Sequence, residues 1–265
     1  MSIETLLHKT YLTKDDIIQL LQSKGDDEKL LFDFSGEIKL QNVGNTVHLR
    51  GLIELSNICE KDCYYCGIRK SNTYVQRYSI SDDEVLEAIQ YAYDKGYGSV
   101  AIQSGEIQSN AFTEKITRIL QKTTKLSNGK LGVTRSCGEQ TEETFRQWFE
   151  VGAKRYLLRI ETSNPELYSK LHPNDDIHRF ERRLEALEML KKTGYQTGTG
   201  VMIGLPFQTV ENLADDLLFM KQFDIDMCGM GPYIEHHETP LYAFKDSLIP
   251  LKERFNLSLK MVAIL

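Results

Sequence analysis

Residues 50–66 read RGLIELSNICEKDCYYC and join an apolar segment to a loop that contains three cysteines. Residues 47–55 have the apolar, β-prone character of a strand, and the loop follows directly. Cys59, Cys63 and Cys66 are spaced C-x3-C-x2-C, so three thiolates can point into one small volume. Three thiolates suit a soft metal centre, and no fourth ligand is obvious in the sequence. The segment therefore predicts a strand that ends at a metal site with one open position.

A strand–helix alternation continues from this segment to the end of the chain. The predicted strands cover residues 47–55, 99–103, 131–134, 155–160, 196–203 and 226–229. Helical periodicity and capping signals predict helices at residues 81–92, 113–122, 141–148, 180–192, 209–223 and from 256 onward. About six such β/α units indicate a parallel sheet.

An open doubly wound sheet and a closed barrel both fit this alternation. Polar residues follow nearly every predicted strand, where barrel enzymes keep their sites, and no Gly-x-Gly-x-x-Gly follows the first strand. Both features favour a parallel (β/α) barrel of the TIM type over residues 47–265. A full eight-fold barrel needs about 250 residues, so we expect a barrel truncated after about six units, with its C-terminus missing. Residues 1–46 are expected to form helices that pack on one end of the barrel.

The composition excludes some classes of partner. The formal net charge of −6 argues against nucleic acid or an anionic membrane. No apolar run is long enough to span a membrane, and the N-terminus lacks the features of a signal peptide, so we expect a cytoplasmic protein. The five cysteines are an odd number and three of them are clustered, which is unlike a disulfide framework.

Two other interpretations of the cysteine loop remain open at this point. A structural zinc site needs four ligands, often as two C-x2-C pairs, and Cys63 with Cys66 is a single pair. Cys137 and Cys228 are isolated and are expected to be core residues. A redox C-x-x-C pair would leave Cys59 unexplained.

With Tyr65 directly before the third cysteine, the loop resembles the signature of the radical S-adenosylmethionine (SAM) family. The resemblance implies a [4Fe–4S] cluster held by Cys59, Cys63 and Cys66. It also implies that the open iron binds the amino and carboxylate groups of SAM, and that electron transfer cleaves SAM to a 5′-deoxyadenosyl radical. In such enzymes the cofactor carries the chemistry, while the protein positions it and excludes water.

Other segments narrow the resemblance to the biotin synthase-like group, and within it to the HydE-type [FeFe]-hydrogenase maturases. These segments are RGLIELSN at residues 50–57, YCGIR at 65–69, RY at 77–78, QSGE at 103–106, RYLLRIET at 155–162, MIGLP at 202–206 and GPYI at 231–234. The resemblance implies a small-molecule substrate, a sulfur-containing iron-bound cysteine species. It implies as partners an electron donor such as ferredoxin or flavodoxin, and other hydrogenase maturases. A related amino-acid mutase or synthase, of the methylornithine synthase or biotin synthase type, and a non-catalytic iron–sulfur carrier are the alternatives.

The resemblance also implies roles for residues at the ends of the predicted strands. Glycine in the Ser104–Glu106 motif allows close backbone approach, and a carboxylate there can hold an ammonium group. Arg183 matches an arginine that binds the SAM carboxylate, a task that suits a guanidinium. The full set expected to contact the cofactor is Tyr65, Gln103, Ser104, Gly105, Glu106, Ser136, Glu161, Arg183, Met202 and Tyr233. Thr134 and Arg159 are expected to contact the substrate.

Two residues depart from the pattern of the family. His172 stands in Leu171-His172-Pro173 where an arginine is common, which predicts a weaker anion contact. Phe207 replaces a glycine in the turn that follows Leu205-Pro206.

Overall fold

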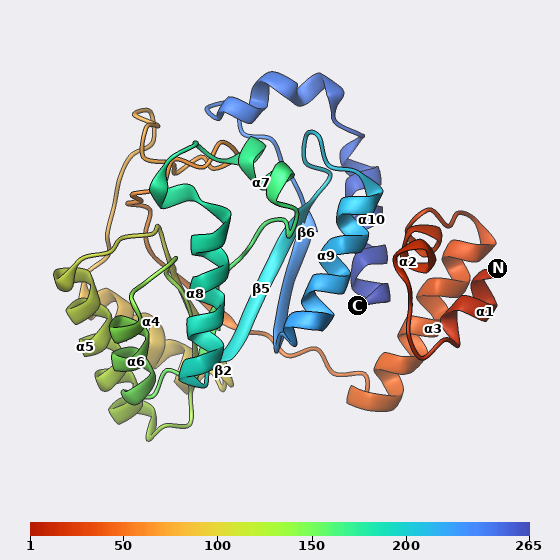
Figure 1. The fold of residues 1–265 in the computed structure, drawn as a ribbon. Coiled ribbons are helices and arrows are strands. Elements are labelled where there is room, and N and C mark those ends of the chain that lie inside the picture. The colour runs from red at the N-terminus through yellow and green to blue at the C-terminus, as the bar shows by residue number, and fades with distance from the viewer.

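The computed structural model describes residues 1–265, and its centre is a sheet of six parallel strands (Figure 1). The strands are β1 (Gly51–Ser56), β2 (Ser99–Ser104), β3 (Gly132–Ser136), β4 (Arg155–Leu157), β5 (Gln196–Ile203) and β6 (Met227–Pro232). They are hydrogen-bonded in the order β1-β2-β3-β4-β5-β6, and every neighbouring pair is parallel.

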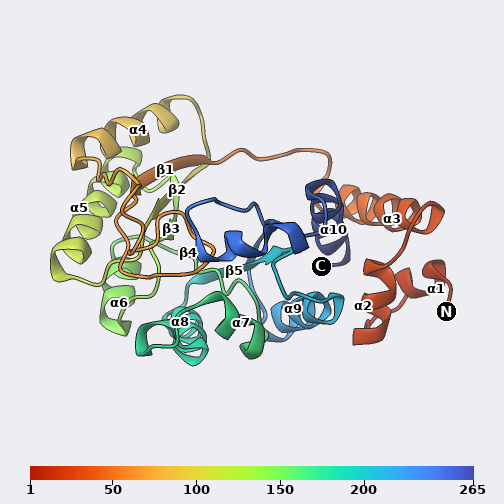
Figure 2. The same ribbon diagram turned by 90° about the horizontal axis from the view of Figure 1, so that it is seen from above.

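This strand order decides between the two expected architectures. A doubly wound sheet reverses its order at a switch point, whereas here each strand lies beside its predecessor. Each strand connects to the next by a right-handed crossover, and the strand order always advances in the same direction. All connecting helices therefore lie on one face of the sheet, as Figure 2 shows. These helices are α4 (Asp82–Asp94), α5 (Asn110–Ser127), α6 (Glu142–Glu150), α8 (Phe180–Thr193) and α9 (Val210–Phe223). The prediction of a TIM-type barrel of about six units is therefore confirmed.

The core lies between the outer face of the sheet and these helices. Leu55 and Ile102 point outward from β1 and β2, are fully buried, and belong to one apolar cluster with Ile89 of α4. Glu54 and Gln103, the chain neighbours of Leu55 and Ile102, are exposed and point to the opposite, inner face of the sheet. The inward-pointing side chains of the strands are therefore available to line a site inside the barrel.

Two predicted strands are shorter than expected. Residues 47–50 have no strand partner, because β1 pairs with β2 only from Gly51 onward. The strand predicted at residues 155–160 ends at Leu157, because the hydroxyl of Thr199 interrupts the ladder. This hydroxyl donates to the carbonyl of Leu158 at 2.9 Å and accepts from the N–H of Ile160 at 3.1 Å.

Three helices occupy the N-terminal segment: α1 (Ile3–Leu7), α2 (Lys14–Leu21) and α3 (Asp26–Val43). They pack beside α9 and α10 (Leu251–Ile264), at the side of the sheet beyond β6 (Figures 1 and 2). The expectation that they cover an end of the barrel is therefore wrong. Their place follows from Ile17 and Leu21 of α2, which join the main core cluster. The domain boundary at residue 46 stays a prediction.

The remaining elements are α7 (Pro165–Leu171) and two short 3-10 helices, η1 (Asp176–His178) and η2 (Pro240–Ser247). Helix α7 was not predicted, although Asn164 caps it and Pro165 begins it. Phe207 adopts a left-handed backbone with φ of +67°, which explains why a glycine suits that turn. A search for a helix able to cross a membrane finds none.

Asp216 of α9 accepts hydrogen bonds from the segment that follows β4. Its carboxylate is fully buried and accepts bonds from the backbone N–H and the hydroxyl of Ser163, both at 2.6 Å. Burial raises the pKa of the Asp216 carboxyl from 3.8 to about 6. The folded protein therefore binds this proton more tightly than the unfolded chain does.

Stability should consequently fall as the pH rises from about 4 to 6, and Asp216→Asn should abolish this component. We expect the difference in unfolding free energy between pH 4.5 and 7.5 to change by roughly 2 kcal/mol in the variant. Urea unfolding followed by the fluorescence of Trp148, the single tryptophan, measures it. Asp215→Asn, on the same helix but partly exposed, is the control. Identical pH dependence in wild type and Asp216→Asn would refute the assignment.

Candidate functional site

The cysteine loop follows β1 at the carboxyl edge of the sheet. Cys63 is buried, whereas Cys59 and Cys66 are partly exposed, and all three are free thiols. Arg77 holds the loop together, because its guanidinium donates to four carbonyl oxygens at 2.7–3.0 Å. These carbonyls belong to Asn57, Ile68, Arg69 and Asn72. Both ends of the loop are therefore fastened to one side chain.

The end of β2 packs directly on the loop. The N–H of Glu106 donates to the Sγ atom of Cys59 at 3.3 Å, and the N–H of Gly105 donates to the carbonyl of Ser56 at 2.8 Å. A Cβ atom at Gly105 would lie 2.2 Å from the carbonyl oxygen of Ile58. Only glycine fits there, which agrees with the close backbone approach inferred from the sequence.

The three thiols are hard to ionise without a metal or a nearby cation. Burial raises the pKa of the Cys63 thiol to about 12, and it also raises the pKa values of Cys59 and Cys66. Backbone N–H groups of Glu106 and Ile68 oppose this effect at Cys59 and Cys66 respectively, because they favour the thiolate. Thiolates that receive backbone hydrogen bonds fit the ligands of an iron–sulfur cluster.

No three Cys, His, Asp or Glu side chains converge closely enough to hold a single metal ion. In a four-iron cluster each thiolate binds a different iron, so the sulfurs need not converge on one point. The three cysteines in one loop and the donors aimed at their sulfurs are compatible with such a cluster.

A group of five charged side chains, here named the ion network, lies behind the loop, and all of them but the partly exposed Arg182 are buried. Lys61 lies 3.1 Å from Glu106 and 2.9 Å from Glu139. Arg183 lies 2.7 Å from Glu139 and 3.4 Å from Glu106, and Arg182 lies 3.0 Å from Glu139. Three cations thus face two carboxylates. The surplus positive charge suits the binding of a further carboxylate.

The pKa values of the two carboxylates of the ion network are shifted in opposite directions. Burial raises the pKa of Glu106, and Arg183 only partly opposes this. Burial acts in the same direction at Glu139, but Arg183 and Lys61 outweigh it and hold the pKa of Glu139 below its usual value. The cations of the network therefore favour the ionised form of Glu139 more strongly than that of Glu106.

Sequence reasoning assigned no role to Lys61, Glu139 or Arg182. Glu139 had a usable signal, because an acidic residue follows β3 just as Glu106 follows β2 and Glu161 follows the β4 segment. Lys61 had none, since nothing in a loop sequence shows that a lysine will be buried. Only the folded chain brings these three residues together.

Arg159 and Glu161 form an ion pair at 3.0 Å, as their same-face spacing allows. The Nη2 atom of Arg159 also donates to the carbonyl of Val201 at 2.9 Å. Glu161 adopts a left-handed backbone with φ of +65°, an unusual conformation that turns the chain at the carboxyl end of the sheet. Its carboxylate therefore already has one cationic partner.

The other expected contact residues fall into separate groups. Tyr65 and Met202 pack against an apolar cluster of Leu167, Leu171, Leu205, Tyr233 and Leu241. Gln103, Ser104 and Ser136 lie near the carboxyl ends of β2 and β3, and Ser104 donates to the carbonyl of Gly105 at 2.7 Å. Thr134 is buried and accepts from Arg50 at 3.3 Å. Arg50 directly precedes β1, and Thr134 is the middle residue of β3.

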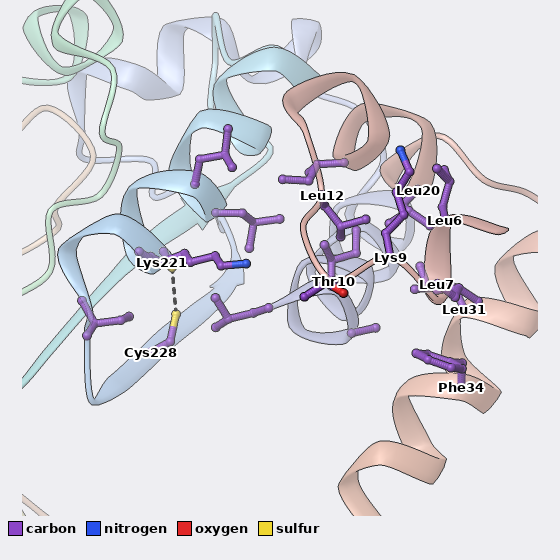
Figure 3. Close-up of a pocket in the computed structure, with 18 of the residues that line it drawn as sticks. Leu6, Leu7, Lys9, Thr10, Leu12, Leu20, Leu31, Phe34, Lys221 and Cys228 are labelled. Atoms are coloured by element: carbon purple, nitrogen blue, oxygen red, sulfur yellow. Dashed lines mark hydrogen bonds between the residues drawn. The ribbon is translucent and has the colours of Figure 1, made fainter. Parts of the chain in front are cut away.

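An apolar cavity of about 570 Å³ lies elsewhere, between the N-terminal helices and α9 (Figure 3). Its wall includes Leu6, Leu20 and Leu31 from α1, α2 and α3, together with Cys228 near the start of β6. The amino end of β6 is the opposite end of the sheet from the cysteine loop. Cys228 and Cys137 pack on or in the main core, as expected.

Comparison with known proteins agrees with this geometry. Residues 53–220 match the model of the radical SAM superfamily. The [FeFe] hydrogenase maturase subunit HydE of Thermotoga maritima is 43% identical over 244 residues, which cover 92% of this chain and 66% of that protein. The 3-methylornithine synthase of Methanosarcina acetivorans is 27% identical over 266 residues, covering 99% of this chain and 72% of that protein.

The fold has a close counterpart among solved structures. The crystal structure of a methylornithine synthase superposes with a TM-score of 0.84 at 22% identity, over 100% of this chain and 75% of that chain. At that identity the likeness shows the fold alone. This chain spans 66% of the length of the HydE relative. The superfamily match over more than half of the chain and the 43% identity to HydE establish that the chain belongs to the radical SAM superfamily.

Proposed function

We propose that this chain is the catalytic barrel of a radical SAM enzyme that acts in the maturation of [FeFe]-hydrogenase. The observation that carries the proposal is the three-cysteine loop, in which the sulfurs of Cys59 and Cys66 receive backbone hydrogen bonds and behind which three cations face two carboxylates. The 43% identity to a HydE maturase supports the choice of pathway.

Cys59, Cys63 and Cys66 would hold a [4Fe–4S] cluster. The chemistry that the bound cluster and SAM supply is a one-electron, reductive cleavage of SAM. The protein holds the loop in place and stabilises the charge of the thiolates. Arg77 fixes the loop, and the N–H of Glu106 stabilises the thiolate of Cys59. The ferredoxin or flavodoxin expected as electron donor belongs to this proposal.

The ion network would recognise the carboxylate of SAM through its surplus positive charge. Arg183 is the central cation, because it touches both Glu106 and Glu139 and donates to the carbonyl of Arg159 at 3.2 Å. Since its donors already face protein oxygens, SAM would join or replace one of these partners. The proposed cofactor contacts are Tyr65, Gln103, Ser104, Gly105, Glu106, Ser136, Glu161, Arg183, Met202 and Tyr233.

The inner face of β6 supports a substrate space near Arg159. Gly229 and Gly231 share this face, whereas the glycines of β5 are closely packed, since a Cβ atom at Gly200 would lie 1.9 Å from the carbonyl oxygen of Gly229. A Cβ atom at Gly229 would have the Nη1 atom of Arg159 among its nearest neighbours, at 3.9 Å, and one at Gly231 would meet nothing within 4 Å. An amino-acid carboxylate suits a guanidinium, and it would join Glu161 and the carbonyl of Val201 as a partner of Arg159.

The proposed substrate is accordingly an iron-bound cysteine species, and Thr134 is its second proposed contact. Other hydrogenase maturases are the proposed partners. Incubation of the reconstituted protein with the iron–cysteine substrate, with amino acids and with dethiobiotin separates maturase, mutase and biotin synthase activities. Turnover of an amino acid or dethiobiotin alone would reject the maturase assignment.

Release of 5′-deoxyadenosine separates an enzyme from an iron–sulfur carrier. The reduced, reconstituted wild type should release it from SAM, whereas Cys63→Ala should lose at least about 100-fold in rate because a cluster ligand is missing. Chromatography of the product and the iron content of each protein are the measurements. Cys228→Ala, outside the loop, should retain both. Release by Cys63→Ala at the wild-type rate would refute the ligand assignment.

Arg77→Lys tests how the loop is held. A lysine has one ammonium and no planar fork, so it cannot bond four carbonyls spread over the loop. We expect a loss of about 1–3 kcal/mol in stability and a lower iron content after reconstitution. Thermal unfolding and iron analysis measure these effects. Arg118→Lys, at an exposed helical ion pair, should change neither. Equal iron content in Arg77→Lys and wild type would contradict the role of Arg77.

A further inference from the structure

Residues 171–178, which are the last residue of α7 and most of its connection to α8, hold the cysteine loop at four positions. The carbonyl of Leu171 accepts from the N–H of Tyr64 at 2.9 Å, and the carbonyl of Ile177 accepts from the Lys61 ammonium. Two histidine side chains make the other two contacts. His178 accepts from the N–H of Asp62 at 2.8 Å, and His172 lies 3.2 Å from the hydroxyl of Tyr65.

The hydrogen-bond partners of His172 define its tautomer. Its Nδ1 atom lies 2.9 Å from the carbonyl oxygen of Tyr168, which can only accept, so Nδ1 carries the hydrogen. The Nε2 atom is then an acceptor and faces the hydroxyl of Tyr65. His172 is 3% exposed, and burial lowers its pKa to about 3, in agreement with a neutral ring.

His178 has the same arrangement with different partners. Its Nδ1 atom lies 2.7 Å from a carboxylate oxygen of Asp175, so Nδ1 is the donor and Nε2 accepts the N–H of Asp62. The two rings lie close together, with centroids 6.1 Å apart. Two adjacent histidines thus present acceptor nitrogens to the same loop.

Packing further restricts the His172 ring. It stacks on Tyr168 with centroids 3.9 Å apart, and it meets the ring of Tyr65 edge-on at 5.4 Å. A ring held between these two aromatic side chains, with its Nδ1 atom bonded to the carbonyl of Tyr168, can orient the hydroxyl that bonds to it. An arginine at position 172 could donate but not accept, so it could not receive the hydroxyl hydrogen in this way.

We propose that His172 is a positioning residue that fixes the ring of Tyr65 beside the cysteines by accepting its hydroxyl hydrogen, and that it does not contact an anion. This inference rests on the proposed function in one respect: Tyr65 is taken to contact SAM. His178 acts alongside it by holding the backbone of the loop at Asp62.

A mutant cycle in the reconstituted full chain tests the proposal. His172→Phe keeps an aromatic ring but removes the acceptor, and Tyr65→Phe removes the donor with the loss of one oxygen atom. Each should weaken SAM binding roughly threefold to tenfold, the effect of one lost hydrogen bond. His172→Gln, which retains an acceptor, should bind within about twofold of wild type. Equilibrium dialysis with labelled SAM and iron analysis are the measurements.

Coupling between the two residues gives the decisive comparison. The double variant Tyr65→Phe/His172→Phe should bind SAM no more weakly than either single variant, because one bond is lost in all three. The proposal would be overturned if the losses of SAM affinity in the two single variants multiply in the double variant. It would also be overturned if His172→Gln binds SAM as weakly as His172→Phe does. If His172→Phe fails to fold, Tyr65→Phe and His172→Gln still give the comparison.

A second measurement does not depend on SAM or on the cluster. Nitrogen-15 NMR of the six histidines in the metal-free full chain should show His172 as the Nδ1–H tautomer, and Tyr65→Phe should shift its Nε2 resonance. An Nε2–H tautomer, or an unchanged resonance in Tyr65→Phe, would overturn the proposal. A wild type that fails to cleave SAM but shows this tautomer and shift would reject the proposed function alone.

Discussion

Lys61 reaches from the cysteine loop into a buried ion network that joins the ends of β2 and β3 to α8. It pairs with Glu106 and Glu139 at 3.1 and 2.9 Å, and Arg183 pairs with the same two carboxylates. A buried charge is tolerated only where it has its partners, and Lys61 finds both of its carboxylates at the assembled strand ends. The loop therefore takes this position only when both strand ends and the helix are assembled.

The loop has few backbone hydrogen bonds of its own and takes its shape from its neighbours. Its bonds from Cys66 to Cys63 and from Arg69 to Cys66 are single turns. Arg77 fastens both of its ends, and residues 171–178 hold its middle. Because burial raises the pKa values of the three thiols, binding of a metal centre must release protons. Cluster binding is therefore coupled to deprotonation of the three thiols.

Much of the fold was predictable, because alternating strands and amphipathic helices leave a clear periodic pattern. The strand predicted at residues 196–203 agrees with β5, and the helix predicted at 180–192 differs from α8 by one residue. The early end of β4 was not predictable, since it depends on the Thr199 hydroxyl from a neighbouring strand. The position of the N-terminal helices was also mispredicted, because amphipathic helices show that a face is buried but not against what.

The sequence by itself determined the class of chemistry and the end of the sheet that carries it. The spacing of Cys59, Cys63 and Cys66 is local, and the carboxyl ends of parallel strands meet at one edge whatever the details of packing. Only the tertiary structure decided which charges are buried together and which groups orient the loop. Glu139 joins Lys61, and His172 meets Tyr65, across 78 and 107 residues of chain. Contacts over such separations depend on how strands and helices pack, which no local pattern encodes.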